Sequence, residues 1–316
     1  MDDRLQVAVL MGGPSAEREV SLRSGAAVAA ALERTGAAVA RVDVRGTVLK
    51  LPADVDVVFV ALHGTFGEDG TVQRLLEELG LPYTFSDAAA SARAFDKIAA
   101  KEAFVAAGIS TPRWAVVERT DRQFVPLRSL RWPLVIKPAR QGSSVGIELV
   151  EKPEDLQHAC LVAGQYDDRL LVEERIAGRE FTVAVMDERT LPVIEVRSKR
   201  TFFDYEAKYT KGETDYLVPA PVAEATRERM QALARQAHEC LGCRDLSRVD
   251  MMMDGAGELF VLEVNTVPGF TETSLVPKAA LADGMSFDRL CGHLVRRALA
   301  RRSREGSRRA PALVTA

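Results

Sequence analysis

Apolar positions along this chain form short runs that alternate with helical stretches. Residues 6–11, 37–44 and 55–62 are almost wholly apolar, as expected for strands that are buried on both faces. A Gly-Gly-Pro turn ends the first run, and an alanine-rich helical stretch follows it. Strand, glycine turn, helix and strand in succession predict an α/β fold with an N-terminal doubly wound parallel sheet. Such sheets bind ligands beyond the carboxyl ends of their strands, where this turn and His63 lie.

Three domains are predicted from the order of these patterns. Residues 1–97 form the parallel-sheet domain, and residues 98–181 alternate short strands and helices of a size that suits a small α+β domain. Residues 182–316 form the third domain, with a long amphipathic helix over 224–241. From 301 to 316 the chain turns to Arg, Ser, Gly and Ala without apolar periodicity, which predicts a largely disordered basic tail.

A predicted hairpin near the C-terminal end carries the most informative polar pattern. Its strand-like runs, 246–254 and 258–265, are joined through Asp-Gly-Ala-Gly. The polar positions at i, i+2 spacing are Arg248, Asp250, Glu263 and Asn265. Because strand side chains alternate between faces, a hairpin could gather all four. Carboxylates with an amide oxygen suit Mg²⁺ that also holds phosphate, and an arginine suits a developing oxyanion. The hairpin alone leaves open a merely solvated polar face.

Composition and charge narrow the class of protein. With 316 residues, 47% hydrophobic and 28% charged, the chain exceeds one typical core and is typical of globular proteins. A net charge of −3 gives no reason to expect a nucleic-acid partner. No apolar run is long enough to span a bilayer and the N-terminus lacks a signal pattern, so we expect a cytoplasmic protein with no membrane partner. Cys240-x-x-Cys243 beside His238 is interpreted as core packing rather than as half of a zinc site.

A second candidate site follows an apolar strand. Lys137 comes directly after Leu-Val-Ile and opens the loop Pro-Ala-Arg-Gln-Gly-Ser-Ser-Val-Gly. Small residues leave backbone N–H groups free to approach phosphate oxygens, and Ser143 and Ser144 add hydroxyl donors. The spacing is not that of a Walker A loop, and a solvated connection is the alternative. Residues 171–183 are typical of strand, connection and strand, which at a domain junction could contact adenine and ribose or serve only as a linker.

Together these motifs resemble the ATP-grasp carboxylate–amine ligases. The resemblance rests on Val-Ile-Lys-Pro before the glycine-serine loop, on Glu-x-x-x-x-Gly-x-Glu-Phe-Thr-Val, and on Arg-Val-Asp followed by Leu-Glu-Val-Asn-Thr-x-Pro-Gly. Within that superfamily the chain is similar to the D-alanine–D-alanine ligases. The motifs that carry this are Gly-Gly-Pro-Ser-Ala-Glu-Arg-Glu-Val-Ser-Leu, Ala-Leu-His-Gly-x-x-Gly-Glu-Asp-Gly, Tyr-Glu-Ala-Lys-Tyr and Ser-Leu-Val-Pro. The resemblance covers about residues 6–298.

The resemblance implies ATP-dependent joining of two D-alanine molecules for peptidoglycan precursor synthesis. One carboxylate would attack ATP to give an acyl phosphate and ADP, and the second amine would then expel phosphate. It implies ATP and two Mg²⁺ ions, with Mn²⁺ able to replace them, and a homodimer formed through the first domain. Ligases that use D-lactate or D-serine as the acceptor remain an alternative. A nucleotide-binding regulatory protein that has lost turnover is the alternative from another class.

Site residues follow from the same resemblance. The ATP-binding residues would be Lys97, Lys137, Ser144, Glu173, Ile176, Glu180 and Lys208. The metal ligands would be Asp250, Glu263 and Asn265. The substrate-binding residues would be Glu17 and His63 for the first D-alanine, and Ser274 and Leu275 for the second. The catalytic residues would be Glu17, Ser143, Tyr209, Arg248 and Gly269, with Arg248 and the Gly269 N–H forming the oxyanion hole. Tyr209, on a loop over 205–211, would hydrogen-bond toward Ser143 and Glu17.

Three positions depart from the family pattern. Phe85 and Asp87 stand where the family typically has glycines, and Phe270 replaces a common methionine. We expect the first two to repack a turn near the junction of the first two domains. We expect Phe270, near the second substrate subsite, to affect acceptor selectivity. Tyr209 favours an amine acceptor, because ester-forming relatives typically carry phenylalanine there.

Overall fold

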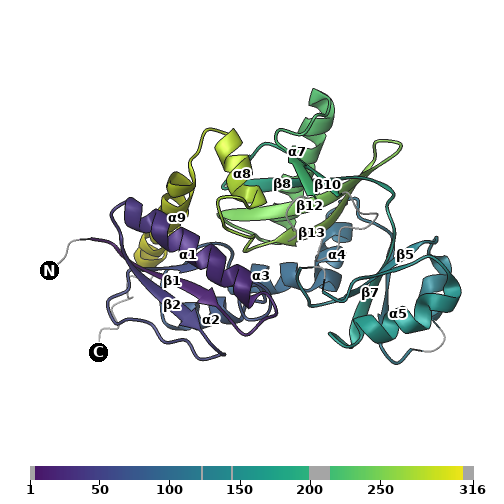
Figure 1. The fold of residues 1–316 in the computed structure, drawn as a ribbon, viewed down its shortest axis with the longest axis horizontal. Coiled ribbons are helices and arrows are strands. Elements are labelled where there is room, and N and C mark those ends of the chain that lie inside the picture. The colour runs from purple at the N-terminus through teal and green to yellow at the C-terminus, as the bar shows by residue number, and fades with distance from the viewer. Residues whose placement is uncertain (1–3, 122–123, 144, 199–213, 309–316) are drawn as a thin grey trace, which may run out of the picture.

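Three sheets make up the chain in the computed structural model, which describes residues 4–121, 124–143, 145–198 and 214–308 (Figure 1). The first sheet contains β1 (Gln6–Gly12), β2 (Ala38–Val44) and β3 (Val57–Val60) in the order β2-β1-β3. Both pairings are parallel, so the predicted N-terminal parallel sheet is confirmed. All four β3 side chains are buried, since the strand is covered on both faces.

Helices α1 (Arg18–Arg34), α2 (Thr71–Glu78) and α3 (Ala88–Phe95) follow the strands of this sheet. Helix α1 packs against β1 and β2. Gly25 permits that close approach, because a Cβ at this position would lie 2.4 Å from the Cβ of Met11. Tight packing of α1 fixes the glycine turn before it, and this turn leads into the candidate site.

The second sheet is antiparallel and lies in the middle of the chain. Its strands are β4 (Trp114–Glu118), β5 (Leu134–Pro138), β6 (Glu148–Val150) and β7 (Arg169–Glu174), in the order β4-β7-β5-β6. Helix α4 (Lys97–Ala106) precedes the sheet and α5 (Leu156–Ala163) packs on β5 and β6. Two short 3₁₀ helices complete this part of the chain, Val125–Ser129 and Pro153–Asp155.

The third sheet carries the predicted hairpin. Its strands are β8 (Gly178–Met186), β9 (Arg189–Thr190), β10 (Ile194–Ser198), β11 (Thr214–Leu217), β12 (Leu246–Asp254) and β13 (Leu259–Asn265). The order is β11-β10-β8-β12-β13, with β9 paired to β8, and α7 (Glu224–Cys240) packs on this sheet. The antiparallel β12–β13 pairing confirms the hairpin. The domain division at 97 and 181 stays a prediction, and β8 begins before the second of these positions.

The C-terminal helices return to the first sheet. Helix α9 (Phe287–Arg308) contacts α1 and β3, and α8 (Leu275–Ala282) precedes it (Figure 1). Their apolar residues share one core with β1 and β3. The predicted disordered tail is therefore wrong over 301–308, where α9 continues. Arg301 is held there by the Asp245 carboxylate and by the Tyr83 carbonyl at 2.5 Å. Within the described ranges no helix is long and apolar enough to cross a membrane.

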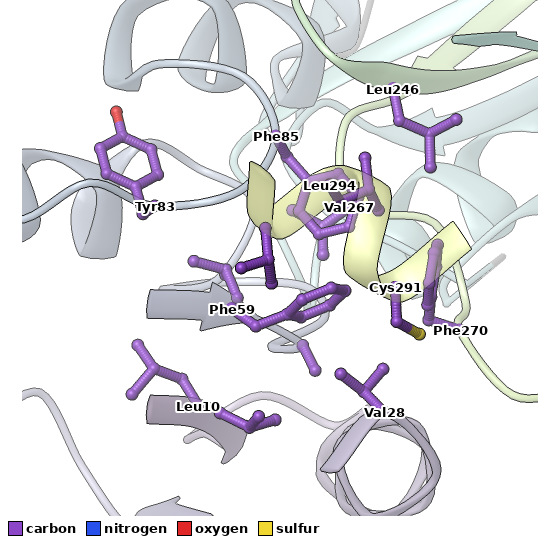
Figure 2. Packing of buried hydrophobic residues seen from close by; sticks show 14 of the residues in the cluster. Leu10, Val28, Phe59, Tyr83, Phe85, Leu246, Val267, Phe270, Cys291 and Leu294 are labelled. Carbon is purple, nitrogen blue, oxygen red and sulfur yellow. The ribbon is translucent and has the colours of Figure 1, made fainter. Parts of the chain in front are cut away.

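Phenylalanine rings fill part of this shared core, and Figure 2 shows three of them, Phe59, Phe85 and Phe270. The Phe59 ring centroid lies 5.5 Å from that of Phe85 and 5.6 Å from that of Phe270, and Phe270 also packs against Phe287 at 5.8 Å. Phe270 is 1% exposed and packs in the core, while its chain neighbours Gly269 and Thr271 line a cavity, so its effect on acceptor selectivity stays a prediction. Phe85 adopts a positive φ of 73° in its turn, and Asp87 caps α3 by accepting from Ala90 N at 2.9 Å.

Candidate active site

The hairpin gathers its four polar side chains as the sequence predicted. The register pairs Arg248 with Asn265 and Asp250 with Glu263. Arg248 donates two hydrogen bonds to Asp250, at 2.8 and 2.7 Å, and Asn265 Nδ2 lies 3.1 Å from Asp250 and 3.5 Å from Glu263. On the neighbouring strand the Thr182 hydroxyl donates to Asp250 at 2.6 Å. The polar face is therefore a partly buried, interconnected group and not a merely solvated one.

Arg248 remains charged at every relevant pH. Burial disfavours its guanidinium, but the Asp250 carboxylate, with Glu263 and Glu68 further away, raises the pKa of Arg248 above its ordinary value. A permanent cation with two fixed N–H groups suits stabilisation of an oxyanion.

Two cavities meet at this group. One, of about 600 Å³, opens between the second and third sheets. The other, of about 690 Å³, lies between the hairpin, the turn after β1 and the start of α8. The residues that line both are Glu180, Val196, Asp250 and Glu263. A molecule in the first cavity and a molecule in the second would thus face each other across three carboxylates.

The first cavity combines apolar walls with a buried charge cluster. Val135, Ile147, Ile176, Met252 and Leu262 supply apolar lining, as a flat aromatic ring requires. At its base the Glu173 carboxylate, 2% exposed, is ion-paired with both Lys137 and Lys101. Burial opposes the Glu173 charge, yet the two lysines lower the pKa of this carboxyl.

The two lysines respond differently to this pairing. Burial opposes the charge of Lys137, but Glu173 raises its pKa, so this ammonium persists. Burial, together with repulsion by Lys137, lowers the pKa of Lys101 to about 8. Attraction to Glu173 offsets this shift only partly. Lys101 also donates to the Thr111 hydroxyl, which in turn donates to the Val261 carbonyl at 2.7 Å. The charge cluster therefore connects α4, β5, β7 and β13.

Lys97, at the start of α4, lies beside the hairpin and the glycine-serine loop. Its Nζ donates to the Gln141 carbonyl at 2.5 Å and lies 3.9 Å from Glu263 Oε2. A small cavity lined by Lys97, Gly142, Glu263 and Asn265 adjoins it. Lys97 is thus close to the carboxylates where the two larger cavities meet.

Glu17 is enclosed by two glycines and one hydroxyl. Ser143, in the glycine-serine loop, donates its hydroxyl hydrogen bond to Glu17 Oε1. A Cβ at Gly64 would lie 2.7 Å from Glu17 Oε2, and a Cβ at Gly142 would lie 2.5 Å from it. Because neither Gly64 nor Gly142 has a side chain, the glycine-serine loop can lie close to the end of the first sheet, with Glu17 between them. Ser143 and Glu17, toward which Tyr209 is predicted to hydrogen-bond, are thus in direct contact with each other.

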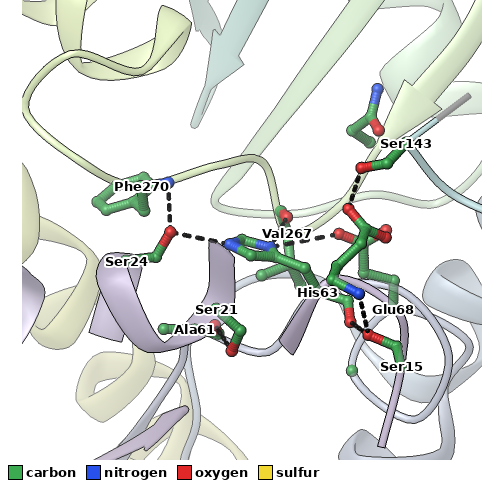
Figure 3. A network of polar contacts seen from close by, with 12 residues as sticks. Ser15, Ser21, Ser24, Ala61, His63, Glu68, Ser143, Val267 and Phe270 are labelled. Carbon is green, nitrogen blue, oxygen red and sulfur yellow. Dashed lines mark hydrogen bonds and ion pairs between the residues drawn. The ribbon is translucent and has the colours of Figure 1, made fainter. Parts of the chain in front are cut away.

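His63 lies in a polar network below the second cavity (Figure 3). Its ring nitrogens lie 2.9 Å from the Ser24 hydroxyl and 3.1 Å from the Val267 carbonyl, and Glu68 Oε1 is 3.6 Å away. Ser24 also accepts from Phe270 N at 3.2 Å. Burial, reinforced by Glu17, raises the pKa of Glu68 to about 7 even though His63 opposes the shift. Burial alone would lower the pKa of His63, but Glu68 raises it.

The opposite wall of the second cavity is the turn that leads into α8. Gly269, Ser274 and Leu275 all line it, as the sequence predicted for the oxyanion and second-substrate residues. Ser274 caps α8, and its Oγ accepts from Thr271 N at 3.0 Å. The first N–H groups of a helix lack carbonyl partners within it, so this end can bind an anion.

Three predicted site residues, Ser144, Lys208 and Tyr209, lie outside the described residues, as does the whole 205–211 loop. Two residues of the site were missed by sequence reasoning, namely Lys101 and Glu68. Lys101 follows Lys97 by one helical turn, and Glu68 lies inside the quoted Ala-Leu-His-Gly motif. Spacing on α4 could have suggested Lys101, whereas the approach of Glu68 to His63 depends on the fold.

The side-chain oxygen atoms of the hairpin are suitable ligands for a hard divalent cation. No group of three His, Cys, Asp or Glu that could hold a metal occurs in the described part of the chain. Two carboxylates with the side-chain oxygen of Asn265 form an all-oxygen set of the kind that Mg²⁺ prefers when phosphate oxygens supply the other ligands.

Family comparisons agree with this geometry. The family described as D-ala D-ala ligase C-terminus matches residues 104–296, and the one described as D-ala D-ala ligase N-terminus matches residues 40–86. A D-alanine--D-alanine ligase of Syntrophotalea carbinolica is 49% identical over 287 residues, which is 90% of this chain and 93% of that protein. The one of Methylacidiphilum infernorum is 46% identical over 285 residues, or 90% and 92% of the two chains.

Solved structures are similar over nearly the whole chain. The D-alanine--D-alanine ligase of Bacillus anthracis complexed with ATP superposes with a TM-score of 0.86 at 34% identity, covering 96% of this chain and all of that one. The VanG D-Ala:D-Ser ligase of Enterococcus faecalis gives a TM-score of 0.82 at 30% identity, covering 94% of this chain and all of that one.

Proposed function

This chain belongs to the D-alanine–D-alanine ligase family and is an ADP-forming ligase, and from that premise we propose how its own residues join two D-alanine molecules. One observation carries the proposal: Asp250 and Glu263 line both the nucleotide-sized cavity and the adjoining one, with Arg248 beside them. We call these the nucleotide cavity and the substrate cavity. Their junction is where a phosphoryl group would pass from ATP to a carboxylate.

ATP binds in the nucleotide cavity, with its adenine among the apolar residues near Ile176 and its ribose at Glu180. Lys137 and Lys97 hold the phosphates near the hairpin, and the glycine-serine loop with Ser143 and Ser144 covers them. Glu173 fixes the position of Lys137 through their ion pair. Lys208 would add a further cation from the 205–211 loop.

Asp250, Glu263 and Asn265 would hold Mg²⁺, two ions in the family pattern, or Mn²⁺ in its place. When bound, the metal neutralises negative charge on the transferring phosphoryl group. Lys97, beside Glu263, orients the same phosphate oxygens, and its charge offsets their repulsion by the carboxylates.

The first D-alanine binds with its ammonium at Glu17, near His63. Its carboxylate attacks the γ-phosphorus of ATP, so a new oxygen–phosphorus bond forms and ADP leaves. The product is an acyl phosphate, whose phosphate is a good leaving group. Glu17 can hold the ammonium without moving, because Ser143, Gly64 and Gly142 enclose its carboxylate.

The second D-alanine binds by its carboxylate at Ser274 and the N-terminus of α8. Its neutral amine attacks the acyl carbonyl, and the resulting oxyanion is stabilised by Arg248 and the Gly269 N–H. Collapse of this intermediate breaks the carbon–oxygen bond and releases phosphate. Tyr209 would hold the 205–211 loop over the site and exclude water, which would otherwise hydrolyse the acyl phosphate.

We extend the same proposal to the protein's setting. A cytoplasmic homodimer that joins through the first domain, making peptidoglycan precursors, accords with the resemblance. Three separate sheets support a division into three domains, with β8 of the third sheet beginning at Gly178, before the predicted division at 181. Sedimentation of the purified protein would distinguish the dimer from a monomer.

The test is ADP release with Mg²⁺-ATP and D-alanine, followed by mass identification of the product. We expect D-alanyl-D-alanine as the product. Parallel reactions with added D-lactate or D-serine report the acceptor, and predominance of either mixed product would replace the dipeptide assignment. ATP binding without ADP release under any of these conditions would contradict the ligase and favour an inactive nucleotide-binding protein.

A further inference from the structure

Lys278 occupies a position in the substrate cavity that neither the motifs nor the proposed mechanism uses. It lies on α8, four residues after Ser274, so both residues are on one face of the helix. Its Nζ lies 4.4 Å from the centroid of the Tyr216 ring on β11. Lys278, Tyr216, Ser274 and Leu275 all line the substrate cavity.

No carboxylate in the described part of the chain balances the charge of Lys278. Within the described ranges Lys278 makes no ion pair with a carboxylate, whereas Arg248 and Lys137 have acidic partners in the same region. Burial is the cause that lowers the pKa of Lys278. The Tyr216 ring face attracts and orients the ammonium but does not neutralise it. A half-buried cation of this kind is a favourable place for an anion.

We propose that Lys278 is a specificity-determining residue that pairs with the carboxylate of the acceptor D-alanine. This inference rests on the proposed function, which places that carboxylate at Ser274 and the first N–H groups of α8. The positive end of the helix and the ammonium one turn later then act on the same anion. Lys278 thereby favours acceptors that carry a carboxylate over those that carry a neutral group there.

The experiment is a competition between two acceptors. The enzyme is given Mg²⁺-ATP, D-alanine and D-alaninamide, in which the carboxylate is replaced by a neutral amide. Mass spectrometry then gives the ratio of D-alanyl-D-alanine to D-alanyl-D-alaninamide. We expect the parental enzyme to favour the dipeptide acid, and Lys278→Met to reduce this ratio on the order of tenfold. The KM for the acceptor D-alanine rises, while the KM for ATP is unchanged.

Two variants make the test specific. Lys278→Arg keeps the positive charge and is expected to retain most of the parental ratio. Lys152→Met removes an exposed lysine just before the second 3₁₀ helix, outside the substrate cavity, and is expected to leave the ratio unchanged. If Lys278→Met does not fold, Lys278→Gln replaces it, because glutamine keeps a polar side chain without the charge.

An unchanged ratio in Lys278→Met would overturn the inference while dipeptide formation by the parental enzyme still supported the proposed function. An equal loss of both products would overturn it too, since a purely structural role would affect both acceptors alike. Failure of the parental enzyme to make either product would refute the proposed function and the inference together.

Discussion

The nucleotide cavity and the substrate cavity adjoin, yet they are built differently. In the nucleotide cavity the charged groups at the base lie on regular elements and are ion-paired, as Lys101 and Lys137 are with Glu173. The substrate cavity is assembled from turns far apart in sequence. Glu17, Glu68 and Lys278 line it, and their charges are not fully balanced by opposite charges. The nucleotide cavity is therefore coupled to folding stability, whereas the substrate cavity has charges left for its ligands.

The largest effect is expected where the two cavities meet. Arg248→Ala removes the oxyanion donor and should reduce kcat about 10²- to 10³-fold, because one preorganised donor contributes that much to acyl transfer. ATP affinity, measured by calorimetry at saturating Mg²⁺, should change little. Arg248→Lys keeps the charge but not the two parallel N–H groups, so its kcat should lie between that of the parental enzyme and that of Arg248→Ala. Parental turnover by Arg248→Ala would refute the oxyanion role.

Stability of the nucleotide cavity is tested by Lys101→Met. Lys101 is 1% exposed, and its removal leaves Glu173 with a single partner. We expect a loss of about 3 kcal/mol in the free energy of unfolding, at the low end for breaking a buried ion pair. Urea denaturation measures this. The double variant Lys101→Met/Glu173→Gln should lose less than the sum of the single losses, since the two groups interact directly. Additive losses would indicate that the pairing contributes nothing.

Geometry of the substrate cavity is tested at Gly142. A Cβ there would lie 2.5 Å from Glu17 Oε2, so Gly142→Ala must displace the carboxylate that is proposed to hold the first D-alanine. We expect the KM for that substrate to rise about tenfold, which corresponds to the usual cost of overpacking. Gly255→Ala is the matched control, because a Cβ at Gly255 meets nothing within 4 Å. Equal effects of the two substitutions would contradict the role of Glu17.

The smallest effect concerns pH. Since burial raises the pKa of Glu68 from 4.5 to about 7, the folded protein binds this proton more tightly than the unfolded chain. Between these two values the contribution of Glu68 to stability therefore falls as pH rises. Glu68→Gln should remove that dependence, so its stability relative to the parental protein should increase by about 1 kcal/mol from about pH 6 to about pH 7. Denaturation midpoints across this pH range measure the difference. If the midpoints of the two proteins changed with pH in parallel, the raised pKa of Glu68 would be contradicted.

Local patterns predicted the regular parts of this molecule well. The hairpin and the parallel sheet follow from alternation and from apolar runs, so Asp250, Glu263 and Asn265 were found together with their neighbour Arg248. The role of Phe270 was not predictable, because only the fold brings Phe59, Phe85 and Phe287 around its ring. The start of the C-terminal tail was wrongly predicted to be disordered for a similar reason. Polar composition hid a helix whose Arg301 is held by Asp245, a contact between distant parts of the chain.

Helix α9 completes a core that begins with β1, the first strand of the chain. During synthesis the ribosome releases β1 before the strands of the other two sheets, and α9 after all of them. The parallel sheet must therefore wait, with one part of its apolar surface uncovered, while the other two sheets emerge and fold. An early segment thus reaches its final packing late, so a nascent chain that stops before α9 would expose this surface to aggregation or to chaperones.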